Sequence, residues 1–546
     1  MNQPFAPGPG RPALWAEPAH PHAGSAQPQD TPTRPPQGTV TGPPHGTVTR
    51  PPGPAAAPLL ALAAQPPGGR LLLAAVVAGA LAQSLLVAAP MGLNWTLAGW
   101  GALGVVALGI HRRRTARRPG SAGAARQRRV LAGLAAALLA VPVVTDCAWL
   151  VVLCMLGVCG LAVLTASDAR TWRSVLLAVP MLPMDAVLAV VWAGRGLSRL
   201  RPAVPHHAGS WLRALAVSAG AVWLVGALLS SGDDAFAAVI RHVLPRLELL
   251  TVPARVVLAA AVALAVGTLL HAAARTDGSL DEPSPGRRRP VREWALPLAA
   301  VDGLLIVFLS VQAAVLFGGA QVTHALGTTP AERARQGFWQ LSAVTALTLL
   351  LLAWSAMRCE PARRRDRRLR DGLAGVLVVA SMLLAFSALR RMWLYEQAFG
   401  FTVSRVVVSA VELLVVALLA LVALARARGV AAMLPRLVAG ACAVTLLGLG
   451  LARPDAVVAA ANVARYERTG QLDVAYLRTL SDDAVPALAG LPEPLRRCAL
   501  GERRPAADPW YAVNLARSRA ATALAAADSG TGPLPVACHP QSREEP

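Results

Sequence analysis

The sequence predicts an all-α, polytopic membrane protein, and three observations lead to this fold class. Hydrophobic residues make up 55% of the 546 residues, mean hydropathy is +0.48, and only 15% of residues are charged, whereas soluble domains average about 25%. Apolar runs of about 20 residues, the length of a helix that crosses a bilayer, recur along the chain. Short arginine clusters separate these runs, as is typical of cytoplasmic loops.

The charge of the chain is strongly positive and comes from arginine alone. No lysine is present, so all 52 basic residues are arginine, and the net charge is +22. Mechanisms that need a lysine, such as Schiff-base formation or a P-loop, are therefore excluded. Nucleic-acid binding would need this charge gathered on one folded face. Because the arginines lie between apolar runs instead, we expect the lipid bilayer as the partner and no nucleic acid.

Residues 1–70 predict a disordered cytoplasmic tail. They hold 18 of the 44 prolines and few large apolar residues, so they cannot bury enough surface to offset chain entropy. An eight-residue segment, PPQGTVTG at 35–42, is nearly repeated at 43–50, which is typical of low-complexity sequence. The membrane domain is expected at 71–452 and a soluble helical unit at 453–546.

The membrane domain contains eleven clear apolar runs and one doubtful run at 174–194. Tryptophans stand near the ends of several runs, as they do at membrane interfaces. The clear runs predict spans at about 71–90, 92–110, 130–145, 147–167, 214–230, 250–271, 294–319, 338–357, 372–389, 406–425 and 437–452.

The arginine clusters fix the expected orientation. Loops 111–129, 272–293 and 358–371 are arginine-rich and should face the cytoplasm. An even number of crossings must then separate the first two loops, yet five runs lie between them. We exclude 174–194, because Pro180, Pro183 and Asp185 interrupt it, and interpret it as an interfacial or re-entrant segment. The result is eleven spans in the plasma membrane, with the amino terminus inside and the carboxyl terminus outside. A twelve-span alternative returns the carboxyl-terminal tail to the cytoplasm.

The segment 453–546 returns to a globular composition and predicts about four short helices. The first is expected at Ala456–Arg468, with Asp455 as its N-cap and Gly470 as its end. Further helices are expected after Ser481 and over Trp510–Ala527. An outward location permits a disulfide between Cys498 and Cys538, whereas in the cytoplasm both thiols would stay reduced.

One stretch, residues 390–405 with the sequence RRMWLYEQAFGFTVSR, is specific enough to suggest a family. Two further pieces accompany it: AERARQGFWQL at 331–341, and a set formed by NVARY at 462–466, GQLDVAYL at 470–477 and SDDAVPAL at 481–488. Across most of residues 70–530 the chain resembles a family of bacterial, actinobacterial-type polytopic membrane proteins known only as a domain of unknown function. Phe401 stands where leucine is commoner in that family's R-M-x-L-Y-x-x-x-[YF]-G-[LF]-T-x-x-R signature. The resemblance implies the membrane fold and assigns no activity to any residue.

In physical terms, this signature predicts a loop at the membrane boundary. Arg390, Arg391 and Arg405 flank a turn at Gly400, and Tyr395 adds aromatic surface at the depth of the lipid headgroups. With the loop 320–337 and the carboxyl-terminal unit, this segment is expected to form one extracytoplasmic face. The alternative is that the loop merely caps two helices.

Two carboxylates within spans are further candidates, because intramembrane charges often mark functional sites. Asp302 lies in the 294–319 run and Glu412 in the 406–425 run. If they face the bundle interior, they could relay a proton or hold a cation. Alternatively, arginines neutralise them, with Arg390, Arg391 and Arg405 as the natural partners of Glu412.

No motif for catalysis, a cofactor or a metal is found in the sequence. His271 stands alone at a span end and is expected to be an ordinary interfacial residue. We therefore expect a non-enzymatic membrane protein, without cofactor or metal, that binds, senses or acts as a scaffold at its outer face. A membrane or envelope protein is the expected partner. The alternative is a transporter or channel that uses Asp302 and Glu412.

Overall fold

The computed structural model describes residues 68–87, 89–115, 122–198, parts of 214–229, 252–275, 290–317, 338–358, 364–504 and 508–527. All of these belong to one compact unit, residues 58–546. The described residues form helices and turns without a strand, so the all-α prediction is confirmed. The predicted tail lies outside the described residues except for its last three, because α2 begins at Gly69.

Nine helices in the described part of the chain are long and apolar enough to cross a membrane. They match nine predicted spans, and α15 (Phe338–Arg358) matches a tenth with a shorter apolar core at Gln340–Ser355. Parts of the predicted span 214–230 are described, between residues 214 and 229, and these parts are helical. The candidate spans are Gly69–Leu86, Leu93–Arg113, Ala125–Val144, Ala148–Ser167, Val252–Ala274, Val291–Ala314, Arg364–Gln397, Val403–Ala427 and Ala431–Ala452.

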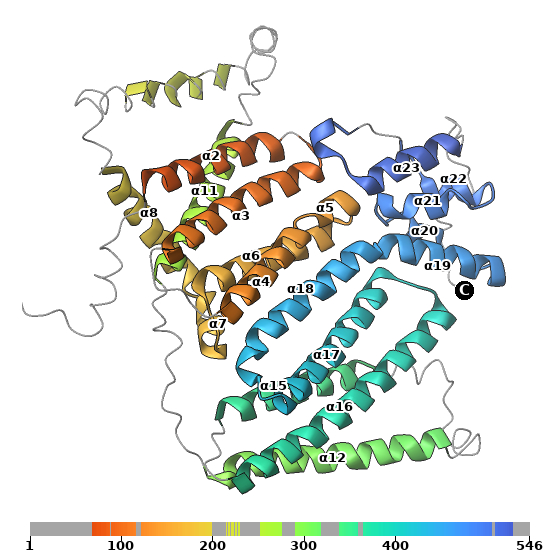
Figure 1. The fold of residues 1–546 in the computed structure, drawn as a ribbon. Helices are drawn as coiled ribbons and strands as arrows, with labels where there is room; N and C mark the ends of the chain where they lie inside the picture. Colours follow the sequence, from red (N-terminus) through yellow and green to blue (C-terminus); the bar gives the residue numbers. More distant parts are fainter. Residues whose placement is uncertain are drawn as a thin grey trace, which may run out of the picture. The chain divides into compact units, whose positions relative to one another are not determined.

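Seven helices pack into the first group (Figure 1), which has two apolar cores. One core lies between α4, α6 and α18, and the other lies between α2, α3, α8 and α11. The helices of this group are α2 (Gly69–Leu86), α3 (Leu93–Thr115), α4 (Ala122–Leu138), α6 (Ala148–Ser167), α8 (Leu182–Ser198), α11 (Val252–Arg275) and α18 (Leu434–Ala452).

The doubtful run is interrupted, as predicted. It forms α7 (Trp172–Ala178) and α8, with a break before Leu182. Although α8 is not among the candidate spans, it packs along α11 in antiparallel register. Asp185 contacts His271, and the Cβ of Ala189 lies 3.9 Å from the Cβ position of Gly267. A helix lying only at the membrane surface would not keep this register with a spanning helix.

The second group consists of α12 (Val291–Phe317), α15, α16 (Arg364–Phe399) and α17 (Val403–Ala427). Each of the others packs on α16, around a core that includes Leu298, Leu377, Leu384 and Leu419. At 36 residues, α16 is far longer than the predicted 372–389 span. The signature is therefore helical up to Phe399 and is not a loop there. No glycine or proline, the two residues that most disfavour a helix, interrupts residues 376–399.

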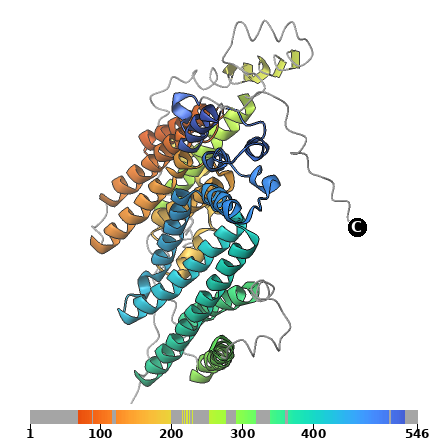
Figure 2. The same ribbon diagram turned by 90° about the vertical axis from the view of Figure 1, so that its right-hand side faces the viewer.

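The carboxyl-terminal segment forms a small helical unit with its own apolar core, which includes Val458, Leu477, Val485 and Leu500. Figures 1 and 2 show its blue helices gathered at one end of the first group, where α3, α5 (Val141–Val144) and α18 contact it. Its elements are α19 (Pro454–Thr469), α20 (Val474–Leu477), η4 (Asp482–Ala484), α21 (Val485–Leu488), α22 (Leu495–Leu500), η5 (Trp510–Ala512) and α23 (Leu515–Ala526).

Asp455 is not the N-cap that the sequence suggested. Arg453, in a left-handed conformation, precedes α19, and Pro454 begins it. Asp455 instead lies buried in the first turn and accepts a hydrogen bond from the backbone N–H of Ser481 at 2.8 Å. Gly470 ends α19 with a φ of 70°, as predicted.

Candidate functional site

The signature forms a tight corner between α16 and α17. Gly400 has a φ of 85°, which a glycine adopts without strain. The Arg405 guanidinium lies 4.4 Å from the centre of the Tyr395 ring and donates to the Gly400 carbonyl. Glu396 is buried one turn before Gly400, in the field of Arg405. Side chains of the signature itself thus hold the end of α16 against the start of α17.

The corner is joined to the carboxyl-terminal unit by two side chains of that unit. The Asn462 side chain accepts from Phe401 N–H at 3.2 Å and donates to the Phe401 carbonyl at 2.8 Å. The Tyr476 hydroxyl accepts from Val403 N–H at 2.8 Å. Burial raises the pKa of Tyr476. Residues 401 and 403 of the signature and residues 462 and 476 of the carboxyl-terminal unit, which are far apart in sequence, therefore form one joint.

A second joint connects the unit to the loop between α5 and α6. Asp483 is buried and accepts from the Thr145 hydroxyl at 2.6 Å and from Asp146 N–H at 2.9 Å. Its other oxygen lies 3.9 Å from the Arg453 guanidinium. Burial raises the pKa of Asp483 and also that of Asp146, against the opposing effect of Arg517 on Asp146.

The last helix strengthens the second joint. Asn514 caps α23 and donates to the carbonyls of Pro142 and Thr145 at 2.8 and 3.0 Å. Arg517 forms ion pairs with Asp146 and Asp508. Because these contacts come from sequence positions about 370 residues apart, no short motif could have revealed them.

Beside this joint the unit exposes an apolar ridge. Trp510, Val513 and Leu515 are 79%, 37% and 41% exposed, while the intervening Ala512 and Asn514 are buried. The Val513 carbonyl accepts from Leu93 N–H at 3.1 Å, so the ridge adjoins the first turn of α3. The ridge is continuous with a membrane-spanning helix.

Cys498, on α22, is disulfide-bonded, and its partner lies outside the described residues, as Cys538 does. Four other described cysteines are free thiols. The loop 320–337 also lies outside the described residues.

The predicted arginine partners do not reach Glu412. Arg391 donates to Gln312 at 3.0 Å, Arg405 binds the corner, and Arg390 is exposed on α16. Among the described residues, no ion pair joins Glu412 to an arginine. The interpretation that these three arginines neutralise Glu412 is therefore wrong. Each arginine lies nearer than Glu412 to the corner at Gly400, where α16 ends and α17 begins.

Asp302 and Glu412 face the same apolar core. On α12, Asp302 stands between Leu298 and Leu305 of that core, and on α17 Glu412 stands between Val408 and Leu419, which pack on it. The exposed fractions are 4% for Asp302 and 2% for Glu412. Both oxygens of Asp302 and one of Glu412 have no hydrogen-bond partner in the described part of the chain.

Hydroxyl groups line the same core. Ser381 of α16 donates to Thr348 of α15 at 2.8 Å, and both are buried. Ser342 of α15 interacts with Glu412 but forms no hydrogen bond of normal geometry. Neither carboxylate lines either of the two described cavities, whose walls are apolar.

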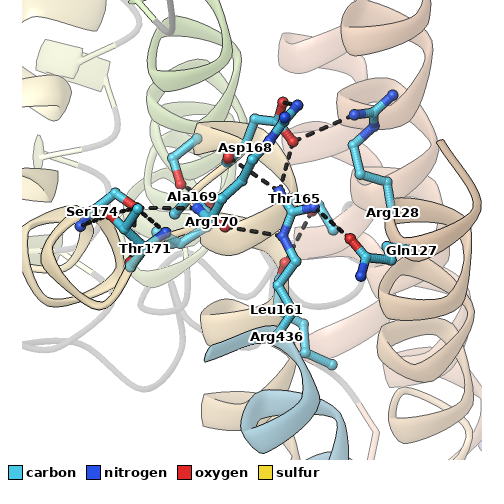
Figure 3. Close-up of polar contacts among 12 residues, drawn as sticks. Gln127, Arg128, Leu161, Thr165, Asp168, Ala169, Arg170, Thr171, Ser174 and Arg436 are labelled. Atoms are coloured by element: carbon cyan, nitrogen blue, oxygen red, sulfur yellow. Dashed lines mark hydrogen bonds and ion pairs between the residues drawn. The ribbon is translucent and has the colours of Figure 1, made fainter. Parts of the chain in front are cut away.

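Figure 3 shows a polar cluster that the sequence analysis missed. Asp168 ends α6 in a left-handed conformation, with a φ of 48°. Arg436, 5% exposed at the start of α18, donates to Asp168, to the Ala169 carbonyl and to Gln127 at 2.8–3.0 Å. Arg128 and Arg170 also contact Asp168. The cluster fastens α4, α6 and α18 at the end opposite the carboxyl-terminal unit.

His271 is likewise not an ordinary interfacial residue. Its Nδ1 lies 3.1 Å from Asp185, and both side chains are 2% exposed. Trp192 packs edge-on against the imidazole at 5.9 Å, and Arg113 lies over the Trp192 ring. Asp185 interrupts the apolar run because it pairs with a histidine 86 residues away.

These helices and their buried polar joints define a multi-pass helical membrane protein. A sequence profile identifies the particular family: residues 132–491 match the domain of unknown function DUF4153. The chain belongs to this family. The matched residues include the whole second helix group and α6, α8, α11 and α18 of the first, whereas α2 and α3 precede them and α23 follows them. No curated protein and no solved structure matches the chain.

Proposed function

We propose that the protein is a non-enzymatic plasma-membrane protein whose carboxyl-terminal unit forms an outer binding platform for another membrane protein. The observation that supports this proposal is the pair of joints, which attach the unit to both helix groups. The hydrogen bonds are partly buried at the first joint and mostly buried at the second. Such joints hold a surface rigid, and rigid surfaces lose little entropy on binding. The apolar ridge of Trp510, Val513 and Leu515 is left exposed beside α3, where a membrane-embedded partner can contact it.

Photocrosslinking in intact cells tests this platform. A benzophenone amino acid at Leu515, on the ridge, is expected to capture one protein. The matched control is the same residue at Arg496, on α22 of the same unit and 28% exposed in its side chain. Crosslinks to lipid alone at Leu515, or the same protein at both positions, would contradict the platform.

The platform faces outward only with the proposed topology. The helices α2 and α8 both run antiparallel to α11, so they run in the same direction through the membrane. Counting α8 as a crossing, in place of 214–230, keeps eleven spans and all three arginine-rich loops in the cytoplasm. An alkaline-phosphatase fusion after residue 455 is expected to be active, and an inactive fusion there would rule out the outward unit.

A second candidate function is proton or cation coupling through the second helix group. It is favoured by two buried carboxylates on one hydroxyl-lined core: Asp302, neither oxygen of which has a partner among the described residues, and Glu412, one oxygen of which has none. A carboxylate in hydrocarbon must be neutralised by a proton or a cation. Liposomes loaded with a pH-sensitive dye and a potassium gradient provide the test. Valinomycin should drive proton uptake above that of empty vesicles, and Asp302→Asn should remove it. Equal uptake by both proteins excludes this function.

A further inference from the structure

An apolar groove lies between α2, α8 and α11. Its cavity measures about 230 Å³ and has almost no polar surface. Small side chains give it depth, and the exposed Val76 and Val190 stand at its open side, 60% and 61% exposed. Its lining includes Leu71 and Ala75 of α2, Ala189 and Trp192 of α8, and Gly267 and Leu270 of α11.

The groove has a closed end and an open end. A Cβ at Gly79 would overlap the carbonyl oxygen of Ala259, so α2 and α11 touch there through their backbones. From Leu71 to Gly79 the helix rises about 12 Å. One leaflet of a bilayer has a hydrocarbon thickness of about 15 Å. The groove therefore has the length of most of one acyl chain.

Cationic side chains stand at the other end of the groove. Arg70 is exposed and directly precedes Leu71. The Arg113 guanidinium lies 5.1 Å from the centre of the Trp192 ring, which lines the groove. The carboxylate nearby, that of Asp185, is held by His271 at 3.1 Å. The rim is thus basic where the apolar lining ends.

We propose that this groove binds an anionic phospholipid, with an acyl chain along α2 and α11 and the phosphate between Arg70 and Arg113. Arginine pairs well with phosphate because its planar donors match two oxygens. A zwitterionic lipid of the same chain length fills the groove equally well, but its headgroup is attracted less strongly by the arginines at the rim. Headgroup charge, rather than chain burial, therefore distinguishes this site from ordinary lipid contact.

Native mass spectrometry of the full-length protein in detergent tests this site. Phosphatidylglycerol and phosphatidylcholine with identical chains are added in turn, and retained lipid is counted. One phosphatidylglycerol should be retained preferentially. Arg70→Gln should weaken it about fivefold, since one basic residue near an anionic lipid contributes about 1 kcal/mol. Val76→Trp, which fills the groove from its exposed side, should abolish the preference.

The matched control is Arg364→Gln, which removes one exposed arginine at the start of α16, outside the groove. It should leave the retained lipid unchanged. Equal retention of both lipids, or equal weakening by Arg364→Gln and Arg70→Gln, would overturn the site. A Val76→Cys, Val222→Cys double variant gives a further check. Formation of a disulfide in it would also overturn the site, because residues 214–230 would then cover the groove. The thermal unfolding midpoint of Val76→Trp shows whether this variant is still folded, so that loss of lipid binding can be told from loss of the fold.

Discussion

The two helix groups differ in whether their buried charged side chains have partners. In the first group, Arg436 meets Asp168 and His271 meets Asp185, each within a hydrogen-bonded or ion-paired contact. In the second group, Asp302 and one oxygen of Glu412 lack a partner among the described residues. A buried charge that is paired fastens helices, whereas an unpaired carboxylate contributes nothing to packing and must bind a proton or a cation. The comparison separates a structural region from a candidate functional one.

The largest effect is expected from breaking a paired charge. Arg436→Met leaves the backbone carbonyls of Asp168 and Ala169 without their arginine donor and removes one of the three arginines on the Asp168 carboxylate. It should lower the free energy of unfolding by about 3–5 kcal/mol. Equilibrium unfolding in mixed micelles measures it. Arg428→Met, at an exposed arginine directly after α17, is the control and should change it by less than about 0.5 kcal/mol. A loss as small as that control would show that the cluster does not fasten the first group.

The next effect concerns the carboxyl-terminal unit, in which Cys498 is disulfide-bonded. Cys498→Ser should lower its stability by about 2–4 kcal/mol, and Cys538→Ser should do the same if the two residues are bonded. Alkylation of the denatured protein, with and without reductant, counts the free thiols. Cys442→Ser, at a free thiol on α18, is the control. A full set of free thiols before reduction would contradict both the bond and the outward location.

A smaller effect is expected from pH at the second joint. Because burial raises the pKa of Asp483 above 3.8, the folded protein holds this proton longer than the unfolded chain does. The contribution of Asp483 to stability is therefore fully present below its unfolded pKa and is lost as pH rises through the folded pKa. Asp483→Asn should flatten this fall, and the exposed Glu467→Gln should not. Equilibrium unfolding of each variant at fixed pH values between 4 and 7 measures it, and identical profiles would contradict the assignment.

The smallest effect is expected in the second group. Asp302→Asn removes a carboxyl group that has no partner to lose, so the free energy of unfolding should stay within about 1 kcal/mol of that of the natural protein. The same unfolding titration measures it. A loss comparable to that of Arg436→Met would show that Asp302 is a structural partner, and the contrast between the two groups would disappear.

Much of the fold was predictable because membrane spans are local in sequence. Helix length and hydropathy located ten of the described spans, and Gly400 and Gly470 marked turns that need a positive φ. Asp302 and Glu412 were found because a charge in an apolar run stands out. His271 was misjudged, since its partner lies 86 residues away, and Asp455 was misjudged because a buried backbone N–H competed for its side chain.

The sequence by itself determined that the protein is helical, crosses a membrane many times and carries its charge between the spans, because each of these depends on composition within about 20 residues. Only the tertiary structure decided that α8 lies along α11, that Asn462 and Tyr476 meet the signature at Phe401 and Val403, and which buried charges have partners. These depend on contacts between distant segments, and such contacts arise when helices pack, not when they form.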